Sequence, residues 1–232
     1  MRKSFMVIAF VLMGEIVVAQ LTASNVKQNK SLVFEDDFSQ TQISKNWIVE
    51  TNEQDTAGFF ITDGQLRLDT ETGITCWYKN ELSGNILIEY DRTVVVNGGK
   101  HDRLSDLNQF WMVTDPQNKM FTRKGGFREY DSMQMYYVGM GGNYNTTTRM
   151  RRYDGSGNLL IVGEYKDSFH LLVPNKKYHI MIVVNKGESK FIVDGNEYFS
   201  FKDDQPFTRG WFAIRSTKSR QLIDNVKIWR LE

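Results

Sequence analysis

Two segments of this sequence, residues 147–153 and 211–217, alternate basic or aromatic residues with others in a pattern that could build an anion-binding surface. Side chains of a strand point to its two faces in turn, so alternate residues share a face. Arginine forks bind carboxylates bidentately, and aromatic rings offer flat apolar surfaces to sugar rings. If both segments line one concave sheet, the groove would carry Arg149, Arg151, Tyr153, Trp211 and Arg215. The alternative is a solvated, salt-bridged sheet face without a ligand.

An anionic sugar such as a uronate can be cleaved by β-elimination, and the sequence contains side chains suited to each step. The reaction needs a group that neutralises the carboxylate, a base for the C5 proton and an acid for the leaving oxygen. His101 lies in a polar loop, residues 100–108, and is the candidate base, because histidine is the residue type most often used for proton transfer near neutral pH. The other candidates are Tyr137, Tyr153, Asn108, Asn143 and the arginines. An exposed histidine without a role is the alternative for His101.

A second enzymatic interpretation is glycoside hydrolysis by Glu89 and Asp91. They occupy positions i and i+2 of one predicted strand, roughly 6.5–7 Å apart on the same face. Paired carboxylates are the groups that sugar hydrolysis uses. A strand with an ordinary polar face is the alternative, and a binding module that does not cleave its ligand is a third functional class.

Short alternating segments separated by turn residues must position these groups. Asp63-Gly64, Asn97-Gly98 and Asp194-Gly195 are hairpin signals between aromatic and β-branched runs. The predicted strands include residues 59–61, 66–68, 86–96, 178–184, 191–193, 198–201, 211–214 and 226–231. Many such strands without a convincing long helix predict an all-β fold, a two-sheet antiparallel sandwich.

The N-terminal residues 1–19 read as a secretory signal peptide, with Arg2 and Lys3 ahead of an apolar run and small residues at Val17-Val18-Ala19. Residues 20–30 are polar and are expected to form a flexible leader before a single domain, residues 31–232. The apolar run is too short for a transmembrane segment. We therefore expect an exported protein, periplasmic or extracellular, and a monomer.

Charge and cysteine content narrow the partners. The chain has 29 Lys and Arg and 28 Asp and Glu, and this near balance argues against nucleic acid as a partner. Its one cysteine, Cys76, has no partner for an internal disulfide. No Cys/His spacing for zinc is present, so no metal site or required cofactor is predicted. A structural Ca²⁺ held by aspartates is compatible with the sequence, which does not place it.

Both ends of the predicted domain resemble a known superfamily. Phe34-Glu35-Asp36-Asp37-Phe38, Gly210-Trp211-Phe212-Ala213-Ile214 and Ile223–Ile228 are similar to the first and last strands of concanavalin A-like lectin/glucanase and laminin-G-type jelly rolls. The resemblance implies a jelly roll whose last strand returns beside its first. Hydrolases of that superfamily carry a third acid after a Glu-x-Asp pair, and here Arg92-Thr93-Val94 follows instead.

A narrower resemblance covers Asp106–Met112, Tyr136–Asn143, Asn145–Arg149 and Ser219-Arg220-Gln221. These segments are similar to an uncharacterised family of exported proteins carried by polysaccharide-degrading bacteria. The resemblance implies a poly- or oligosaccharide ligand and adds Arg220 and Gln221 as candidate binding residues. We expect a carbohydrate-active protein that cleaves an acidic glycan by a lyase-type mechanism, with the hydrolase and the binding module as alternatives.

Overall fold

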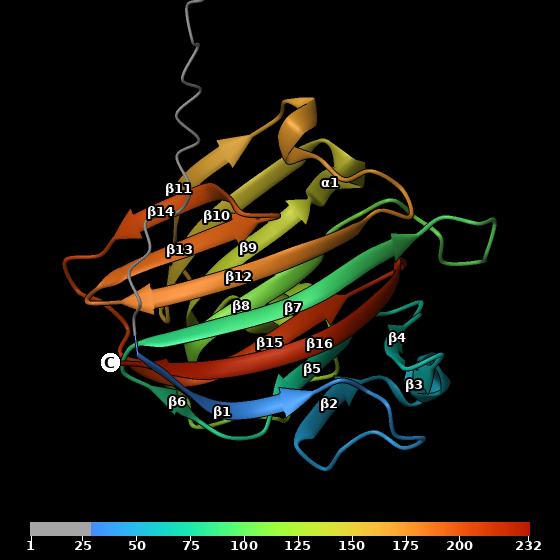
Figure 1. Cartoon of the computed structure of the whole chain (residues 1–232), viewed down its shortest axis with the longest axis horizontal. Helices are drawn as coiled ribbons and strands as arrows, with labels where there is room; N and C mark the ends of the chain where they lie inside the picture. Colours follow the sequence, from blue (N-terminus) through green and yellow to red (C-terminus); the bar gives the residue numbers. More distant parts are fainter. Residues whose placement is uncertain (1–28) are drawn as a thin grey trace, which may run out of the picture.

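A computed structural model describes residues 29–232, in which two antiparallel sheets pack face to face (Figure 1). The signal peptide and residues 20–28 of the expected leader lie outside the described residues. Lys30, assigned to the leader, begins the first strand. No helix among residues 29–232 is long and apolar enough to cross a bilayer.

One sheet, called here the back sheet, has the order β14-β13-β12-β7-β16-β4-β3, and β1 pairs with β16. Its strands are β1 (Lys30–Asp36), β3 (Phe59–Thr62), β4 (Gln65–Leu68), β7 (Ile86–Val95), β12 (Lys177–Asn185), β13 (Glu188–Val193), β14 (Asn196–Lys202) and β16 (Arg220–Leu231). The antiparallel β1–β16 pair places the last strand beside the first, as the resemblance implies.

The other sheet, called here the site sheet, has the order β11-β10-β9-β8-β15-β5-β2, with β6 pairing with β15. Its strands are β2 (Trp47–Thr51), β5 (Ile74–Tyr78), β6 (Leu82–Ser83), β8 (Leu107–Thr114), β9 (Gln134–Gly141), β10 (Thr147–Asp154), β11 (Leu159–Tyr165) and β15 (Arg209–Ser216). The fold class predicted from the alternation, an all-β two-sheet sandwich, is confirmed.

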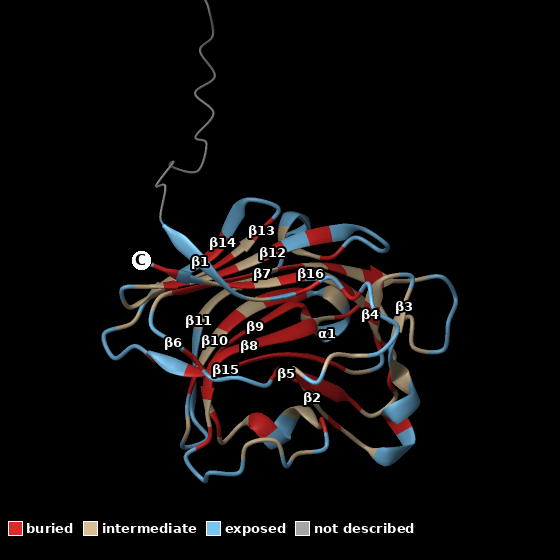
Figure 2. Ribbon diagram, turned by 60° about the horizontal axis from the view of Figure 1, so that its bottom comes forward, coloured by how far each residue is buried: buried red, intermediate tan, exposed pale blue. Residues whose placement is uncertain are grey.

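The main core lies between the sheets, where buried residues of both sheets face one another (Figure 2). In β7, for example, the alternate residues Ile88, Tyr90, Arg92 and Val94 are buried, while the residues between them are partly exposed. Cys76 is also fully buried there as a free thiol. Burial of so much apolar surface stabilises the sandwich without a disulfide.

A second apolar cluster lies on the outer face of the site sheet, beneath the connection between β8 and β9 (residues 115–133). This connection includes the short 3-10 helix η2 (Phe127–Tyr130). Its Tyr130 and Met133 are fully buried against Trp77 and Phe110 of the sheet. We call residues 115–133 the covering loop, because it converts part of an outer sheet face into an interior.

The remaining short elements are η1 (Glu53–Gly58), η3 (Ser168–His170) and α1 (Gly142–Asn145). Asn143, Tyr144 and Asn145 all have positive φ angles, 52°, 58° and 60°, so α1 is a left-handed turn. Such a run is costly for residues other than glycine and needs support from its surroundings. We call residues 142–145 the left-handed turn.

Candidate functional site

A row of directly paired residues crosses the site sheet and forms the floor of a pocket. Arg215 of β15 pairs with Asn108 of β8, which pairs with Gly139 of β9; Gly139 in turn pairs with Arg149 of β10, and Arg149 with Glu164 of β11. Directly opposed residues in antiparallel strands point to the same face. The alternation in two distant segments therefore places Arg149 and Arg215 on one surface.

The next row on the same face contains Phe110, Tyr137 and Arg151. Between the rows, Gly139 leaves space that a side chain would fill: a Cβ there would lie 2.4 Å from Tyr137 Oη and 2.8 Å from Asp106 Oδ2. Glycine is therefore required at this position by close approach, and its missing side chain opens the hollow above the sheet.

The resulting cavity, which we call the arginine pocket, has a volume of about 280 Å³. It lies between the left-handed turn, the covering loop and the loop that precedes β8. Its lining residues include six predicted from the sequence, Asn108, Tyr137, Asn143, Arg149, Arg151 and Arg215, together with Arg103, Ser105, Asp106, Phe127, Gly139, Gly142, Tyr144, Thr147 and Thr217.

The charge of the pocket is strongly positive. Among the described residues, Arg103, Arg151 and Arg215 form no ion pair with a carboxylate; their partners are neutral oxygens of Thr217, Tyr153 and Gly125, respectively. The Nε atoms of Arg103 and Arg151 are buried without a hydrogen-bond partner in this part of the chain. Guanidinium groups that line a pocket without an opposite charge beside them are suited to an anionic ligand.

Arg149 differs from the other three arginines, because it forms an ion pair with Glu164 of the neighbouring strand. Arg215 is only 3% exposed, and burial lowers the pKa of its guanidinium. Its Nη1 donates to Asn108 Oδ1 at 3.0 Å, which leaves the amide nitrogen of Asn108 pointing toward the pocket's hydroxyl and carboxylate groups.

The polar centre of the pocket is a chain of three side chains. Asn108 Nδ2 donates to Asp106 Oδ2 and, at 2.9 Å, to Tyr137 Oη. Tyr137 Oη lies 3.4 Å from Asp106 Oδ2, to which it can donate its proton. Burial, and then the charge of Asp106, raise the pKa of Tyr137 well above its usual value. In the free protein Tyr137 therefore carries its proton and acts as a donor.

The covering loop is held over the sheet by a buried carboxylate. Glu50 of β2 accepts hydrogen bonds from Trp77 Nε1 at 2.8 Å, from Tyr130 Oη at 2.8 Å and from the backbone N–H of Arg123 at 2.7 Å. The Arg123 side chain closes the loop with Asp115 at 2.7 Å. Burial, followed by the charge of Glu50, raises the pKa of Tyr130.

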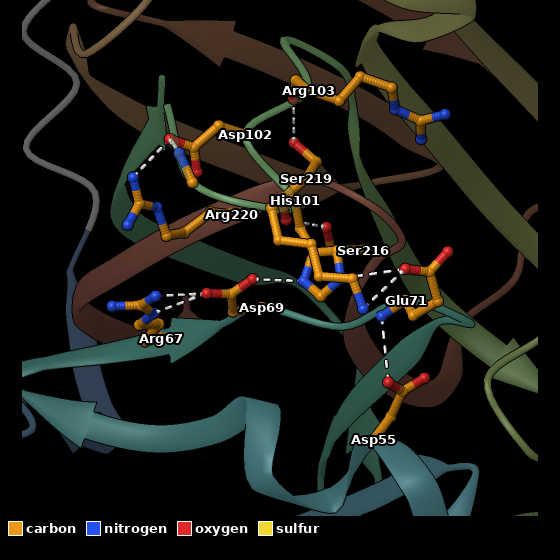
Figure 3. A network of polar contacts seen from close by, with 12 residues as sticks. Asp55, Arg67, Asp69, Glu71, His101, Asp102, Arg103, Ser216, Ser219 and Arg220 are labelled. Carbon is orange, nitrogen blue, oxygen red and sulfur yellow. Dashed lines mark hydrogen bonds and ion pairs between the residues drawn. The ribbon is translucent and has the colours of Figure 1, made fainter. Parts of the chain in front are cut away.

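His101, the candidate base, does not line the arginine pocket. Its two ring nitrogens lie 2.7 Å from Asp69 Oδ1 and 3.2 Å from Glu71 Oε2 (Figure 3). The histidine thus connects the loop before β8 to the segment after β4, and Arg103 of the same loop reaches the pocket. The geometry supports a positioning role, while its assignment as a catalytic base remains a prediction.

Tyr153 and Trp211 also lie away from the pocket. Tyr153 is buried in the cluster beneath the covering loop, and its hydroxyl accepts a hydrogen bond from Arg151 at 3.0 Å. Trp211 lines a larger hollow of about 910 Å³ on the other side of the covering loop. Charged groups there are paired, Asp115 with Arg123 and Arg152 with Asp203. We favour the smaller pocket as the site because its cations lack such partners.

Arg220 and Gln221, the two residues added by the narrower resemblance, form contacts with the loop before β8. Arg220 pairs with Asp102 at 2.6 Å, and Gln221 is fully buried, donating to Ser219 Oγ at 2.7 Å and to Ser105 O at 3.3 Å. Neither lines the arginine pocket. Their contacts hold the segment that carries Arg103 and Asp106.

Glu89 and Asp91 lie in the back sheet, on the opposite side of the sandwich from the arginine pocket. Asp91 accepts from His179 Nδ1 at 2.8 Å and from Asn225 Nδ2 at 3.0 Å, and Glu89 accepts from Trp229 Nε1 at 2.7 Å. Burial opposes ionisation of Asp91, but hydrogen bonds from His179 and Asn225 outweigh it and lower its pKa. A lowered pKa is unfavourable for a general acid.

The pocket residues that were not singled out from the sequence include four with charged or aromatic side chains: Arg103, Asp106, Phe127 and Tyr144. Arg103 and Asp106 lie just before β8, in the polar loop already noted for His101, so their position was a usable signal. Phe127 belongs to the covering loop, which has no strand periodicity, and the left-handed geometry of Tyr144 has no local sequence signature.

No group of three or more His, Cys, Asp or Glu side chains in residues 29–232 is arranged to hold a metal ion. A structural Ca²⁺ held by aspartate and backbone oxygens stays a prediction.

Solved structures with low sequence identity share this fold. A Bacillus subtilis protein of unknown function with a galectin-like fold is 14% identical, with a TM-score of 0.69 over 88% of this chain and 98% of that chain. The endo-β-1,3-glucanase of Pyrococcus furiosus is 12% identical, with a TM-score of 0.61 over 88% and 96%. The carbohydrate-binding module CBM66 of B. subtilis is 14% identical, with a TM-score of 0.55 over 81% and 95%.

These likenesses confirm the concanavalin A-like jelly roll expected from the strand motifs. No curated protein sequence matches the chain. A family model does match residues 68–226, a span that includes the floor of the arginine pocket, the covering loop and the left-handed turn. The chain therefore belongs to the family described as a domain of unknown function, DUF6250.

Proposed function

We propose that the protein is a carbohydrate-active protein whose arginine pocket binds an acidic sugar. The observation that carries this proposal is the set of three guanidinium groups, Arg103, Arg151 and Arg215, that surround one hollow without a carboxylate ion pair among the described residues. A uronate carboxylate would supply the missing acceptors. The proteins of similar fold named above include a glucanase and a carbohydrate-binding module, which supports a saccharide as the ligand class.

β-Elimination is the reaction that we propose for this pocket. The pocket arginines would neutralise the carboxylate of the sugar and acidify its C5 proton, and neutral Tyr137, oriented by the Asn108 amide, would donate a proton to the leaving oxygen. Asp106 is the one carboxylate lining the pocket in the described part of the chain, and it lies within reach of the Tyr137 hydroxyl. It would receive the proton taken from C5.

Binding without cleavage is the second candidate, because a carbohydrate-binding module is among the proteins of similar fold. Hydrolysis has less support, since a glycosidase of the usual kind needs two carboxylates around the bond that it breaks.

Incubation of the protein with acidic and neutral polysaccharides tests these alternatives. Ultraviolet absorbance of an unsaturated uronate together with new reducing ends would demonstrate elimination, and reducing ends alone would demonstrate hydrolysis. Retardation of the protein in gels that contain acidic but not neutral glycan, without products, would establish a binding protein. The proposal fails if no acidic glycan is retained or cleaved, or if neutral glycans behave identically.

A further inference from the structure

The arginine pocket is enclosed on several sides, and its dimensions limit what can enter. Its volume, about 280 Å³, is at the lower limit of small-molecule sites, roughly 300–1,000 Å³. This space suits one sugar ring with its carboxylate and does not suit several consecutive rings.

The covering loop closes the side of the pocket that faces β5 and β2. Arg215 Nε donates to the carbonyl oxygen of Gly125 at 2.8 Å, which fixes the loop to the pocket floor. A Cβ on Gly125 would lie 2.5 Å from Gly73 O and 2.9 Å from Glu50 O, so the loop backbone rests directly on these strands. A glycan chain cannot pass between the loop and the sheet in this direction.

The left-handed turn closes the pocket at the end of β9. The Asn145 amide holds the turn in place, donating to Leu172 O at 2.9 Å and accepting from Leu172 N–H at 2.8 Å. Tyr144 stands at the rim, where the Arg103 guanidinium lies 5.0 Å from its ring centre. The turn is a fixed wall, because two backbone-directed hydrogen bonds over-determine its conformation.

The side facing the edge strand β11 is different. Glu164 and Ile161 border the pocket there as cross-strand neighbours of Arg149 and Arg151. Ile161 is 52% exposed, so no described segment covers this border. A ligand larger than one ring can therefore extend outward over β11.

From this enclosure, and resting on the proposed function, we infer that the arginine pocket recognises a single terminal residue of an acidic glycan and not an internal stretch of the chain. The reducing-end ring would occupy the hollow, with its carboxylate among Arg103, Arg151 and Arg215. The rest of the chain, attached at O4 of this ring, would leave across β11, and elimination would break the C4–O bond to that chain. An open cleft would instead accept a chain running through it from edge to edge.

Binding stoichiometry tests the inference. Galacturonate and glucuronate oligomers of increasing length, and the corresponding polymers, are titrated by calorimetry against the full protein carrying Tyr137→Phe, which should bind acidic glycan without cleaving it. We expect a constant number of bound proteins per glycan chain at every length, and an affinity per mole of chains that stops rising at short oligomers. A number of bound proteins that rises with chain length would overturn the inference while leaving acidic-glycan binding intact. Failure of every acidic probe to bind would instead overturn the proposed function.

A substitution in the wall of the arginine pocket provides a second test of the inference. The Phe127 ring stands 5.4 Å from the Arg215 guanidinium and 5.9 Å from the Tyr137 ring. Phe127→Ala should weaken binding of a short oligomer by about tenfold, the effect of losing an aromatic contact with a buried cation site. It should also let more than one protein bind each polymer chain.

Phe169→Ala is the matched control, because Phe169 is 61% exposed and lies outside the arginine pocket. It should leave both affinity and stoichiometry unchanged. Equal behaviour of the two variants, with both melting as the wild type does, would show that Phe127 does not enclose the ligand and would contradict the inference.

Discussion

The outer faces of the two sheets both carry charged side chains, but in the described part of the chain the charge of Asp91 is paired on the back sheet, while three arginines of the arginine pocket are unpaired. On the back sheet, Asp91 is in contact with His179, Asn225 and Lys177, so its charge is satisfied within the protein. In the arginine pocket, Arg103, Arg151 and Arg215 contact neutral oxygens. The comparison teaches that the number of charged residues on a face says little about ligand binding, whereas the number of charges left without an opposite partner is informative.

Removal of one hydroxyl on each side of the sandwich should give the largest difference. Tyr137→Phe keeps the ring but removes the proposed proton donor, and we expect the rate of elimination to fall by roughly 10²- to 10⁴-fold while ligand binding changes far less. The measurement is product absorbance under saturating acidic glycan. Tyr198→Phe, which removes a hydroxyl bonded to Phe169 O at the back sheet, is the control. Equal rates in all three proteins would remove Tyr137 from the mechanism.

Removal of one cation from each face should give the next largest difference. Arg151→Ala should weaken binding of an acidic oligosaccharide by roughly 10- to 100-fold, since hydrogen bonds to charged groups contribute about 1.5–3 kcal/mol. Lys177→Ala on the back sheet removes an exposed partner of Asp91 and should leave affinity unchanged. Calorimetric titration measures both. A comparable loss in the two variants would mean that net charge, and not the pocket, attracts the ligand.

Filling the pocket floor should have a smaller effect on binding and also reduce stability. A methyl group at Gly139 would displace the Tyr137 hydroxyl and Asp106, so Gly139→Ala should weaken binding about tenfold, consistent with an overpacking cost of 1–3 kcal/mol. Thermal unfolding measured with and without an acidic oligomer separates the two effects. Wild-type affinity in a destabilised protein would show that the ligand does not approach the floor.

The smallest effect is expected at His101 and concerns pH. Burial opposes ionisation of Asp69, but hydrogen bonds from Arg67 and His101 outweigh this effect and lower the pKa of Asp69. Contacts with Lys218, Lys100 and His101 lower the pKa of Glu71 to about 2. Because both folded pKa values lie below their ordinary values of about 4, their stabilising contribution is present above that pH. It is lost as the pH falls through the folded values.

His101→Asn should therefore reduce the free energy of unfolding at neutral pH by about 1 kcal/mol, the usual contribution of a hydrogen bond. The substitution should also make the free energy of unfolding depend less steeply on pH in the acidic range. Urea unfolding at a series of pH values measures both. An unchanged acid profile would show that His101 does not hold these carboxylates in solution.

Strand alternation was sufficient to place Arg149, Arg151 and Arg215 on one surface, because the period of two is a geometric property of every strand. The alternation also predicted Trp211 beside these arginines, and this prediction was wrong for two reasons. The register shifts between Trp211 and Ala213, and the covering loop packs across the sheet face between Trp211 and the arginines. Neither feature follows from a periodic pattern.

The environment of His101 could not be predicted for a different reason. Its partners, Asp69 and Glu71, lie 32 and 30 residues earlier in the chain, and a spacing of this size has no fixed geometric meaning. The polarity of the loop correctly indicated that part of it belongs to the site, since Arg103 and Asp106 reach the pocket. The polarity did not distinguish residues that face a ligand from those that tie the loop to a neighbouring segment.

Glu50 holds the covering loop through backbone and side-chain hydrogen bonds that do not depend on the identity of most loop residues. A change in the length or sequence of the covering loop would alter how much of the sheet it covers. The rows of paired strand residues beneath the loop would stay in register. The same sheet could then offer either a blind pocket or a through-running cleft. Selection for new glycans in such a scaffold would act on one surface connection and leave the folding core untouched.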